Sequence, residues 1–259
     1  RRAWARIAPH LVRPLPFLLG TYRGTKRSRL AVRAGFKLYD LIGRDRNRGV
    51  LPELHLPNGR LESAAATRRL FPGIAESGLS GGAIWYDYQT VHPDRLTWCV
   101  ALAATAHGAV LGNYVEVTGL VKDSGRVSAV TARDGITGND MVIAATHVIF
   151  AAGNGLATLH AACGLGPAPP LVRAMNLLLD RPARDIAVAA ASARGRMYTA
   201  VPWQGRVLVG THQADVVGTG HEAPPSADTI DEFIAEVNTA FPALRATTQD
   251  VRMVHHAMV

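Results

Sequence analysis

Ten histidines and two cysteines are the residues of this 259-residue chain best suited to metal binding, but their spacing does not favour it. His255 and His256 are the only adjacent pair, and neighbouring residues on a strand point to opposite faces. Cys99 and Cys163 lie far apart in apolar, helical patterns, so they indicate neither a disulfide nor a metal knuckle. No Ser-His-Asp order stands out either. We therefore expect no metal, and a reducing compartment.

The stretch "HVIFAAGNGL" (147–156) indicates a different chemistry. In this stretch an apolar run is followed directly by Ala151, Ala152 and Gly153. Residues this small let another group approach the backbone closely. Flavin and nicotinamide proteins often bring a strand to a cofactor in this way. The G-x-G-x-x-G fingerprint that should accompany such a strand is not in the chain. The residues alone leave open a cofactor-facing strand or a core strand that ends in a tight turn.

The formal charge of +8 is concentrated before Arg69, in "RRAWAR", "TYRGTKRSR" and "GRDRNRG". Such clusters could meet phosphates, anionic lipid or nucleic acid, or could form a solvated arginine-rich surface. These basic clusters contain no motif in which aromatic residues alternate with basic ones, as in many nucleic-acid-binding proteins. We therefore expect no nucleic-acid partner. No apolar run approaches the roughly 18 residues that span a bilayer. A 48% hydrophobic share is ample for a packed core.

Residues 1–75 are predicted to be helical and punctuated by prolines. Apolar residues recur at helical spacing over 28–43, where Ser28 is placed as an N-cap. A shorter helix is predicted over 63–71, with Ser63 as its cap.

After Gly78 the pattern changes to strands. A helix is predicted from Pro93 to Gly108, and then a β-meander that returns as a deeply buried strand ending at Gly153. "DG" between two β-rich runs of the meander is a hairpin signal. A short helix follows, and a last one covers 228–240. Between them, a mainly antiparallel sheet is predicted from "RAMNLLLD", "DIAVAAAS", "RMYTAVPW" and "RVLVGTHQ".

The order of these segments resembles the FAD-dependent glycerol-3-phosphate dehydrogenases, members of the D-amino-acid-oxidase-like flavoprotein superfamily. The resemblance spans essentially the whole chain, in "APHLVRPLPFLL", "AGFKLYDLIG", "GGAIWYDYQTVHPDRL", "GAVLGNYVEVTGL", "VIFAAG", "AVPWQGRVLVGTHQAD" and "FPAL". It implies a mixed α/β fold: a flavin-binding doubly wound domain lacking its first strand, and an antiparallel-sheet substrate domain. Residues 1–75 would link the two regions, 76–165 would belong to the FAD domain, and 166–259 would form a truncated substrate domain. The chain would then be a central fragment of the enzyme.

The resemblance also implies which residues meet FAD. Val117 would contact the adenine through its backbone. Ala151, Ala152 and Gly153 would line the diphosphate and ribose region, as close backbone approach requires.

The substrate region implied by the resemblance comprises Tyr86, Gln89, Asn176, Gly210 and Thr211. Tyr86 and Gln89 belong to an element between the flavin and substrate domains, and Gly210 and Thr211 to a turn near the active site. Family members usually have a histidine that faces the substrate in the strand that corresponds to "RAMNLLL", and here that stretch places Met175 and Asn176 there.

The departures from the family bear on the catalytic residues. Asn154 and Gly155 replace a proline and a bulky aromatic residue. His212 either replaces a polar group of the family's turn or is a surface histidine, and the surface position is the expectation. Asn176, Thr211 and His212 are the catalytic candidates, although the flavin itself would carry the hydride.

The resemblance implies oxidation of sn-glycerol 3-phosphate to dihydroxyacetone phosphate, with electrons passed to a quinone or another acceptor. The basic N-terminal third suits an anionic membrane surface, which implies a cytoplasmic protein peripheral to the inner face of the cytoplasmic membrane. One alternative is a flavin enzyme of the same superfamily acting on another 2-hydroxy acid or an amine. Another is a non-catalytic basic module that binds polyanions. The fragment would be inactive alone.

Overall fold

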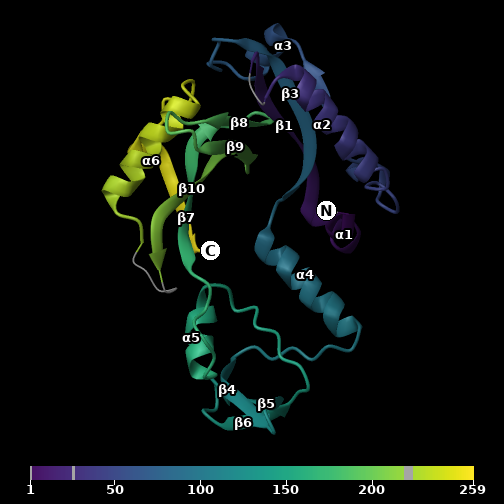
Figure 1. Cartoon of the computed structure of the whole chain (residues 1–259), viewed down its shortest axis with the longest axis vertical. Coiled ribbons are helices and arrows are strands. Elements are labelled where there is room, and N and C mark those ends of the chain that lie inside the picture. The colour runs from purple at the N-terminus through teal and green to yellow at the C-terminus, as the bar shows by residue number, and fades with distance from the viewer. Residues whose placement is uncertain (1, 25–26, 219–223) are drawn as a thin grey trace. The chain divides into compact units, whose positions relative to one another are not determined.

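The computed structural model describes residues 2–24, 27–218 and 224–259. Strands form an eight-stranded mixed sheet in the order β11-β7-β10-β9-β8-β1-β3-β2, and a separate three-stranded sheet in the order β4-β5-β6 (Figure 1). The predicted mixed α/β fold class is therefore confirmed. Two compact units divide the chain. Unit 1 comprises Arg1–Gly108, Asn176–His212 and Ser226–His255, and unit 2 comprises Ala109–Met175, Gln213–Pro225 and His256–Val259.

The N-terminal part of unit 1 contains strands as well as helices. Its elements are α1 (Arg2–Ile7), β1 (Val12–Tyr22), α2 (Arg29–Ile42), β2 (Arg60–Glu62), α3 (Ala64–Leu70), β3 (Leu79–Thr90) and α4 (Pro93–Ala106), with short 3-10 turns at Pro9–Leu11 and Pro52–Leu54. The three predicted helices in this part are confirmed as α2, α3 and α4. Ser28 and Ser63 cap α2 and α3 as predicted, each accepting a hydrogen bond from the backbone N–H three residues on.

The prediction that residues 1–75 are helical is wrong at β1. This 11-residue strand pairs antiparallel with β3 along its length, from Val12↔Thr90 to Tyr22↔Leu79. Its parallel partner β8 meets it only at Phe17–Leu19. Pro14 and Pro16 therefore lie where β1 has a partner on one side only, a position in which a sheet tolerates a missing N–H.

Unit 2 holds the predicted β-meander, which is confirmed. β4 (Val115–Asp123), β5 (Arg126–Asp134) and β6 (Asp140–Ala144) pair antiparallel in sequence order. The hairpin turn between β5 and β6 is held by Asp134, whose Oδ1 accepts the backbone N–H groups of Ile136 and Thr137 at 2.8 and 3.2 Å.

The deeply buried strand predicted to end at Gly153 is wrong. Residues 145–152 form neither helix nor strand, and Ile149 is 90% exposed. A strand is buried only when neighbours cover it, and within the described ranges no strand pairs with this segment. A 3-10 turn, Gly153–Gly155, leads from it directly into α5 (Leu156–Ala162), the short helix that the sequence predicts.

The remaining strands complete the large sheet. They are β7 (Leu171–Pro182), β8 (Ala187–Ala191), β9 (Met197–Trp203), β10 (Arg206–Gly218) and β11 (Val251–Met258), with a 3-10 turn at Thr248–Asp250. The four strands predicted after the proline-rich linker are confirmed, but they share one sheet with β1, β2 and β3 instead of forming a sheet of their own. β7 and β11 are adjacent, and Val172 and Val259 exchange both backbone hydrogen bonds at 2.9 Å.

Helix α6 (Ala227–Ala240) packs on this sheet beside β9 and β10 (Figure 1). Phe233 and Val237 are fully buried on its apolar face, and Ser226 caps its first turn. Burial of side chains of this size contributes roughly 1.5–3 kcal/mol each. The domain boundaries at residues 75 and 165 stay a prediction.

Candidate functional site

The predicted substrate residues Asn176, Gly210 and Thr211 meet on one face of the large sheet. β7 buries Met175 and Leu177, which turns the intervening Asn176 to the other face. Thr211 Oγ1 donates a hydrogen bond to Asn176 Oδ1 at 3.0 Å. A Cβ on Gly210 would lie 1.9 Å from the same Oδ1 atom, so only glycine leaves room for Asn176 there.

Thr199 on β9 adds a third polar side chain beside this pair. It lies opposite Gly210 in the β9–β10 register, and its Oγ1 donates to Gly210 O at 3.1 Å. An amide and two hydroxyls can bind an oxygen-rich ligand by hydrogen bonds, but none of them titrates near neutral pH. The cluster can therefore orient a substrate, and it holds no general base.

His212 was expected at the surface, and that expectation is wrong. The side chain is 9% exposed, whereas Thr211 before it is exposed, so the two occupy different surroundings. The His212 ring lies 5.0 Å from the Phe233 ring, and Nδ1 lies 3.3 Å from Tyr198 Oη. A histidine buried in this way supports the strand under Thr211 from the core side.

A buried carboxylate completes the cluster under the site. Tyr198 is fully buried on β9, and its Oη donates to Oε2 of Glu236 on α6 at 2.8 Å. Glu236 is 7% exposed, and its Oε1 lies 3.4 Å from Arg194 NH1. Burial, the largest influence, raises the pKa of Glu236, but hydrogen bonding from Tyr198 and nearby arginine charges outweigh it, so the net pKa is lowered.

The same contacts act on Tyr198 in the opposite direction. Burial and then the hydrogen bond to Glu236 raise the pKa of Tyr198 to about 12. Glu236 and Tyr198 were missed from sequence. The available signal was the position of Glu236 beside Phe233 and Ala240 on the apolar face of α6, where a carboxylate needs a partner.

Within the described part of the chain, neither Gln89 nor Tyr86 forms a hydrogen bond with Asn176 or Thr211. Gln89 is buried, and both ends of its amide are occupied: Oε1 accepts from Arg13 Nε at 2.8 Å, and Nε2 donates to Pro202 O. Gln89 thereby joins β1, β3 and β9. Tyr86 Oη accepts a hydrogen bond from Arg60, whose guanidinium also lies 5.8 Å from the centroid of the Tyr86 ring.

The predicted cofactor residues all lie in unit 2. Val117 is on β4, an edge strand, so one side of its backbone has no strand partner among residues that the structure describes. Ala151, Ala152 and Gly153 are exposed, and nothing lies within 4 Å of where a Cβ on Gly153 would be. Gly153 has φ +54°, in the left-handed region that favours glycine. Open backbone with small side chains fits close approach by a dinucleotide.

Metal chemistry has no support in the described ranges. They contain no group of three or more His, Cys, Asp or Glu that could hold an ion. His255, one of the adjacent pair, packs edge-on against Trp203 with ring centroids 6.0 Å apart.

Comparison with known proteins gives consistent matches. A family model described as "FAD dependent oxidoreductase" matches residues 1–257. A glycerol-3-phosphate dehydrogenase of Synechocystis sp. is 30% identical over 272 residues, covering 98% of this chain and 47% of the relative. The chain thus spans about half the length of the curated relatives it matches.

Solved structures show the same likeness. The glycerol-3-phosphate dehydrogenase of Bacillus halodurans complexed with FAD has a TM-score of 0.72 at 26% identity, over 99% of this chain and 46% of that one. The L-alpha-glycerophosphate oxidase of Mycoplasma pneumoniae with FAD bound has a TM-score of 0.63 at 14% identity, over 99% of this chain and 66% of that one. The second match shows the fold alone.

Proposed function

Because the chain belongs to the FAD dependent oxidoreductase family, we propose that it is part of a flavoprotein that oxidises sn-glycerol 3-phosphate to dihydroxyacetone phosphate. The observation that carries this proposal is the 30% identity to a glycerol-3-phosphate dehydrogenase across 98% of the chain. The hydrogen-bonding face around Asn176 supports it, because a polyol phosphate presents hydroxyl oxygens to such a face.

Asn176 is the residue best placed to bind the substrate oxygen. Its Oδ1 accepts the Thr211 hydroxyl, which fixes the amide so that Nδ2 points elsewhere. Within the described residues Nδ2 makes no hydrogen bond, so it is free to donate to the C2 oxygen of the substrate. The same hydrogen bond from Nδ2 can be made to the C2 carbonyl oxygen of the ketone product, because that oxygen is also an acceptor. Thr211 then acts by orienting the amide.

FAD, when bound, supplies the acceptor for the substrate hydride. In this chain the open edge of β4 at Val117 would offer backbone to the adenine. Ala151, Ala152 and Gly153 would lie along the diphosphate, since none of them carries a side chain that blocks approach.

The test uses the full-length protein. Its visible spectrum should show a flavin, and glycerol 3-phosphate should bleach that spectrum anaerobically and reduce an artificial dye in steady state. Asn176→Ala should raise KM for glycerol 3-phosphate with flavin content unchanged. A flavoprotein that turns over amino acids or other 2-hydroxy acids but not glycerol 3-phosphate would overturn the substrate assignment.

A second substrate class is favoured by a missing histidine. The dehydrogenases that the sequence resembles usually have a substrate-facing histidine in the strand where this chain has Met175 and Asn176, so the alternative is an enzyme of the same superfamily that acts on another 2-hydroxy acid or an amine. Assays of the full-length protein with glycerol 3-phosphate, with amino acids and with other 2-hydroxy acids distinguish these two substrate classes. A basic polyanion-binding module predicts no flavin and tight, salt-sensitive binding to polyanions instead.

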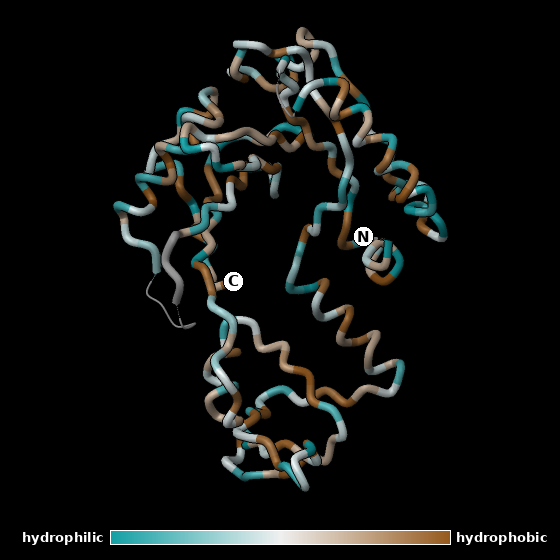
Figure 2. Tube along the Cα trace, viewed as in Figure 1, coloured by the Kyte–Doolittle hydropathy of each residue, from teal (hydrophilic) through white to brown (hydrophobic). Residues whose placement is uncertain are grey.

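The finer proposal is that the intact protein works on an anionic membrane surface, on the inner face of the cytoplasmic membrane, and passes electrons to a quinone or another acceptor. No residue of α2 is buried, and its leucines and isoleucine form an exposed stripe, with Leu30 and Ile42 80% and 74% exposed. Arg33 and Lys37 are exposed on the same helix, which alternates between hydrophobic and hydrophilic residues in Figure 2. An exposed apolar stripe beside cationic residues suits the lipid interface. No helix in the described ranges could cross a membrane.

Liposome co-sedimentation of the full-length protein tests this surface. Binding should require anionic lipid, and Leu38→Glu with Leu41→Glu should abolish it. Leu51→Glu, which introduces a charge at another exposed leucine outside α2, should leave it intact. Equal binding to neutral vesicles, or equal loss with Leu51→Glu, would refute the role of α2.

A further inference from the structure

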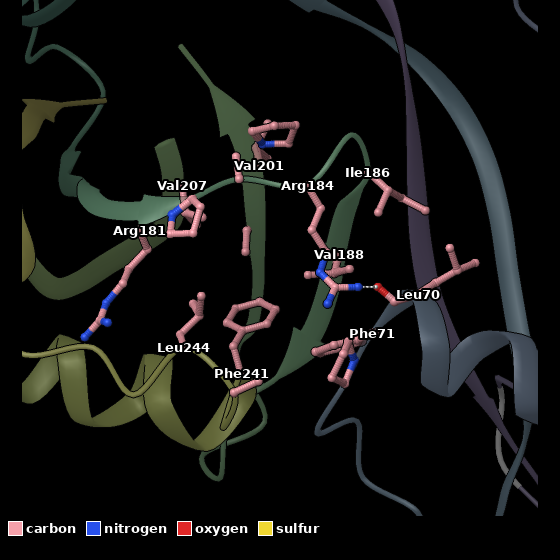
Figure 3. Close-up of a pocket in the computed structure, with 16 residues that line it drawn as sticks. Leu70, Phe71, Arg181, Arg184, Ile186, Val188, Val201, Val207, Phe241 and Leu244 are labelled. Atoms are coloured by element: carbon pink, nitrogen blue, oxygen red, sulfur yellow. Dashed lines mark hydrogen bonds between the residues drawn. The ribbon is translucent and has the colours of Figure 1, made fainter. Parts of the chain in front are cut away.

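Unit 1 contains a cavity of about 340 Å³ that the proposed reaction does not use. Strands β8, β9 and β10 contribute Val188, Val201 and Val207 to its lining, and Phe71 and Phe241 come from the segments after α3 and α6 (Figure 3). This volume is within the range of small-molecule sites, and an apolar lining with few polar groups is typical of them.

Arg184 brings a positive charge to this apolar lining. Its NH1 donates to the carbonyl oxygens of Arg69 and Leu70, at 3.0 and 3.4 Å, at the end of α3. These bonds hold the guanidinium at the end of α3, and Arg184 lines the cavity together with Val188 and Phe71 (Figure 3). Guanidinium has five N–H donors, and among the described residues its Nε and NH2 make no hydrogen bond.

Among the described residues, no carboxylate forms an ion pair with Arg184. The residues that line the cavity include no Asp or Glu. The other arginine of the lining, Arg181, is different: its NH2 pairs with Asp250 Oδ2 at 2.8 Å and donates to Arg245 O at 3.2 Å. The cavity therefore presents one uncompensated cation beside an apolar surface, and an anionic head on an apolar body complements both.

We propose that this cavity binds a small amphipathic carboxylate, an alkyl or aryl chain that ends in one carboxyl group. The carboxylate accepts from Nε and NH2 of Arg184, the fork geometry in which guanidinium and carboxylate pair best. The chain lies on Phe71, Val188 and Phe241. The site does not depend on the identity of the oxidised substrate.

Isothermal titration of the full-length protein with decanoate tests the site, with 1-decanol and decyltrimethylammonium as neutral and cationic probes of matched length. Decanoate should bind at least tenfold more tightly than decanol, and the cation should not bind. Arg184→Met keeps the apolar stem of the side chain but removes a hydrogen-bonded charge pair, so the affinity for decanoate should fall by roughly 10- to 100-fold. The affinity for decanol should not change. The control Arg95→Met removes an exposed arginine outside the cavity and should change neither the decanoate affinity nor the decanol affinity.

Two further variants keep the test decisive if Arg184→Met perturbs α3. Arg184→Lys retains the charge but not the two-donor fork, so it should bind decanoate more weakly than the wild type and more tightly than Arg184→Met. Val188→Trp fills the cavity and should abolish binding of every probe, with the circular dichroism spectrum unchanged. The proposal is overturned if decanoate does not bind the wild-type protein, if decanol binds equally well, or if decanoate binding survives Val188→Trp.

Discussion

Replacing Tyr198 with phenylalanine would remove the hydroxyl that donates to Glu236 Oε2 at 2.8 Å and keep the aromatic ring in place. The Tyr198 ring packs against Phe233 at 5.2 Å between centroids, so the variant leaves no cavity. Hydrogen bonds to charged groups contribute about 1.5–3 kcal/mol. Because Glu236 is nearly inaccessible, water cannot replace the lost donor, and we expect unit 1 to be destabilised by about 2 kcal/mol at pH 7.

Hydrogen–deuterium exchange of the α6 amides in the full-length protein measures this loss of stability, because exchange reports the local opening of α6. At about 1.4 kcal/mol for each factor of ten, protection should fall about 30-fold. The pKa of Glu236 is lowered in the folded protein, so its stabilisation is present above its usual pKa of 4.5 and is lost as pH falls through the lower folded value. The difference between Tyr198→Phe and wild type should therefore shrink below pH 4.5.

Glu236→Gln provides the matched control. It keeps an acceptor for Tyr198 but removes the charge, so adding Tyr198→Phe to it should cost less than in the wild type. The raised pKa of Tyr198 gives an independent check: its stabilisation is full below pH 10.0 and is lost as pH rises toward 12, and Tyr198→Phe should lack this loss. Protection reduced less than threefold at pH 7, or reduced by the same factor at pH 7 and at a pH well below 4.5, would refute an ionised, hydrogen-bonded Glu236.

Three other substitutions test the site and the sheet. Gly210→Ala places a methyl group 1.9 Å from Asn176 Oδ1 and should lower kcat/KM for glycerol 3-phosphate at least tenfold with the fold retained; unchanged kinetics would show that Asn176 does not bind substrate. Thr211→Val should raise KM several-fold because the amide is no longer oriented, and Thr211→Ser should restore it. Gly82→Ala on β3 places its Cβ 2.7 Å from Thr67 Oγ1, and overpacking should lower the unfolding free energy by about 1–3 kcal/mol, measured by urea denaturation.

The resemblance of the sequence segments to a flavoprotein family implied the mixed α/β class, which the large and small sheets confirm. It did not predict that the N-terminal third contributes to the large sheet. The pairing of β1 with β3 joins residues far apart in the sequence, from Tyr22↔Leu79 to Val12↔Thr90, and no local pattern records it. "VRPLPFLL", with its two prolines, is a poor strand by local propensity and becomes one because β3 lies beside it.

For the candidate site too, the sequence could select residues but could not show which of them are in contact. Gly210, Thr211 and Asn176 could be selected from sequence by resemblance, but their contact depends on β7 and β10 being neighbours. His212 was expected at the surface because the resemblance places it in a polar turn. Phe233 and Tyr198, which bury it, come from other elements of the chain.

What the sequence determined by itself is local. Ser28 and Ser63 cap helices, and Asp134 closes a hairpin, because each bonds a backbone group two or three residues away. Burial and charge pairing were decided only by the tertiary structure. A side chain is buried by what covers it and a charge is compensated by what faces it, and the fold sets both: Glu236 is covered and hydrogen-bonded, whereas Ile149 is left exposed.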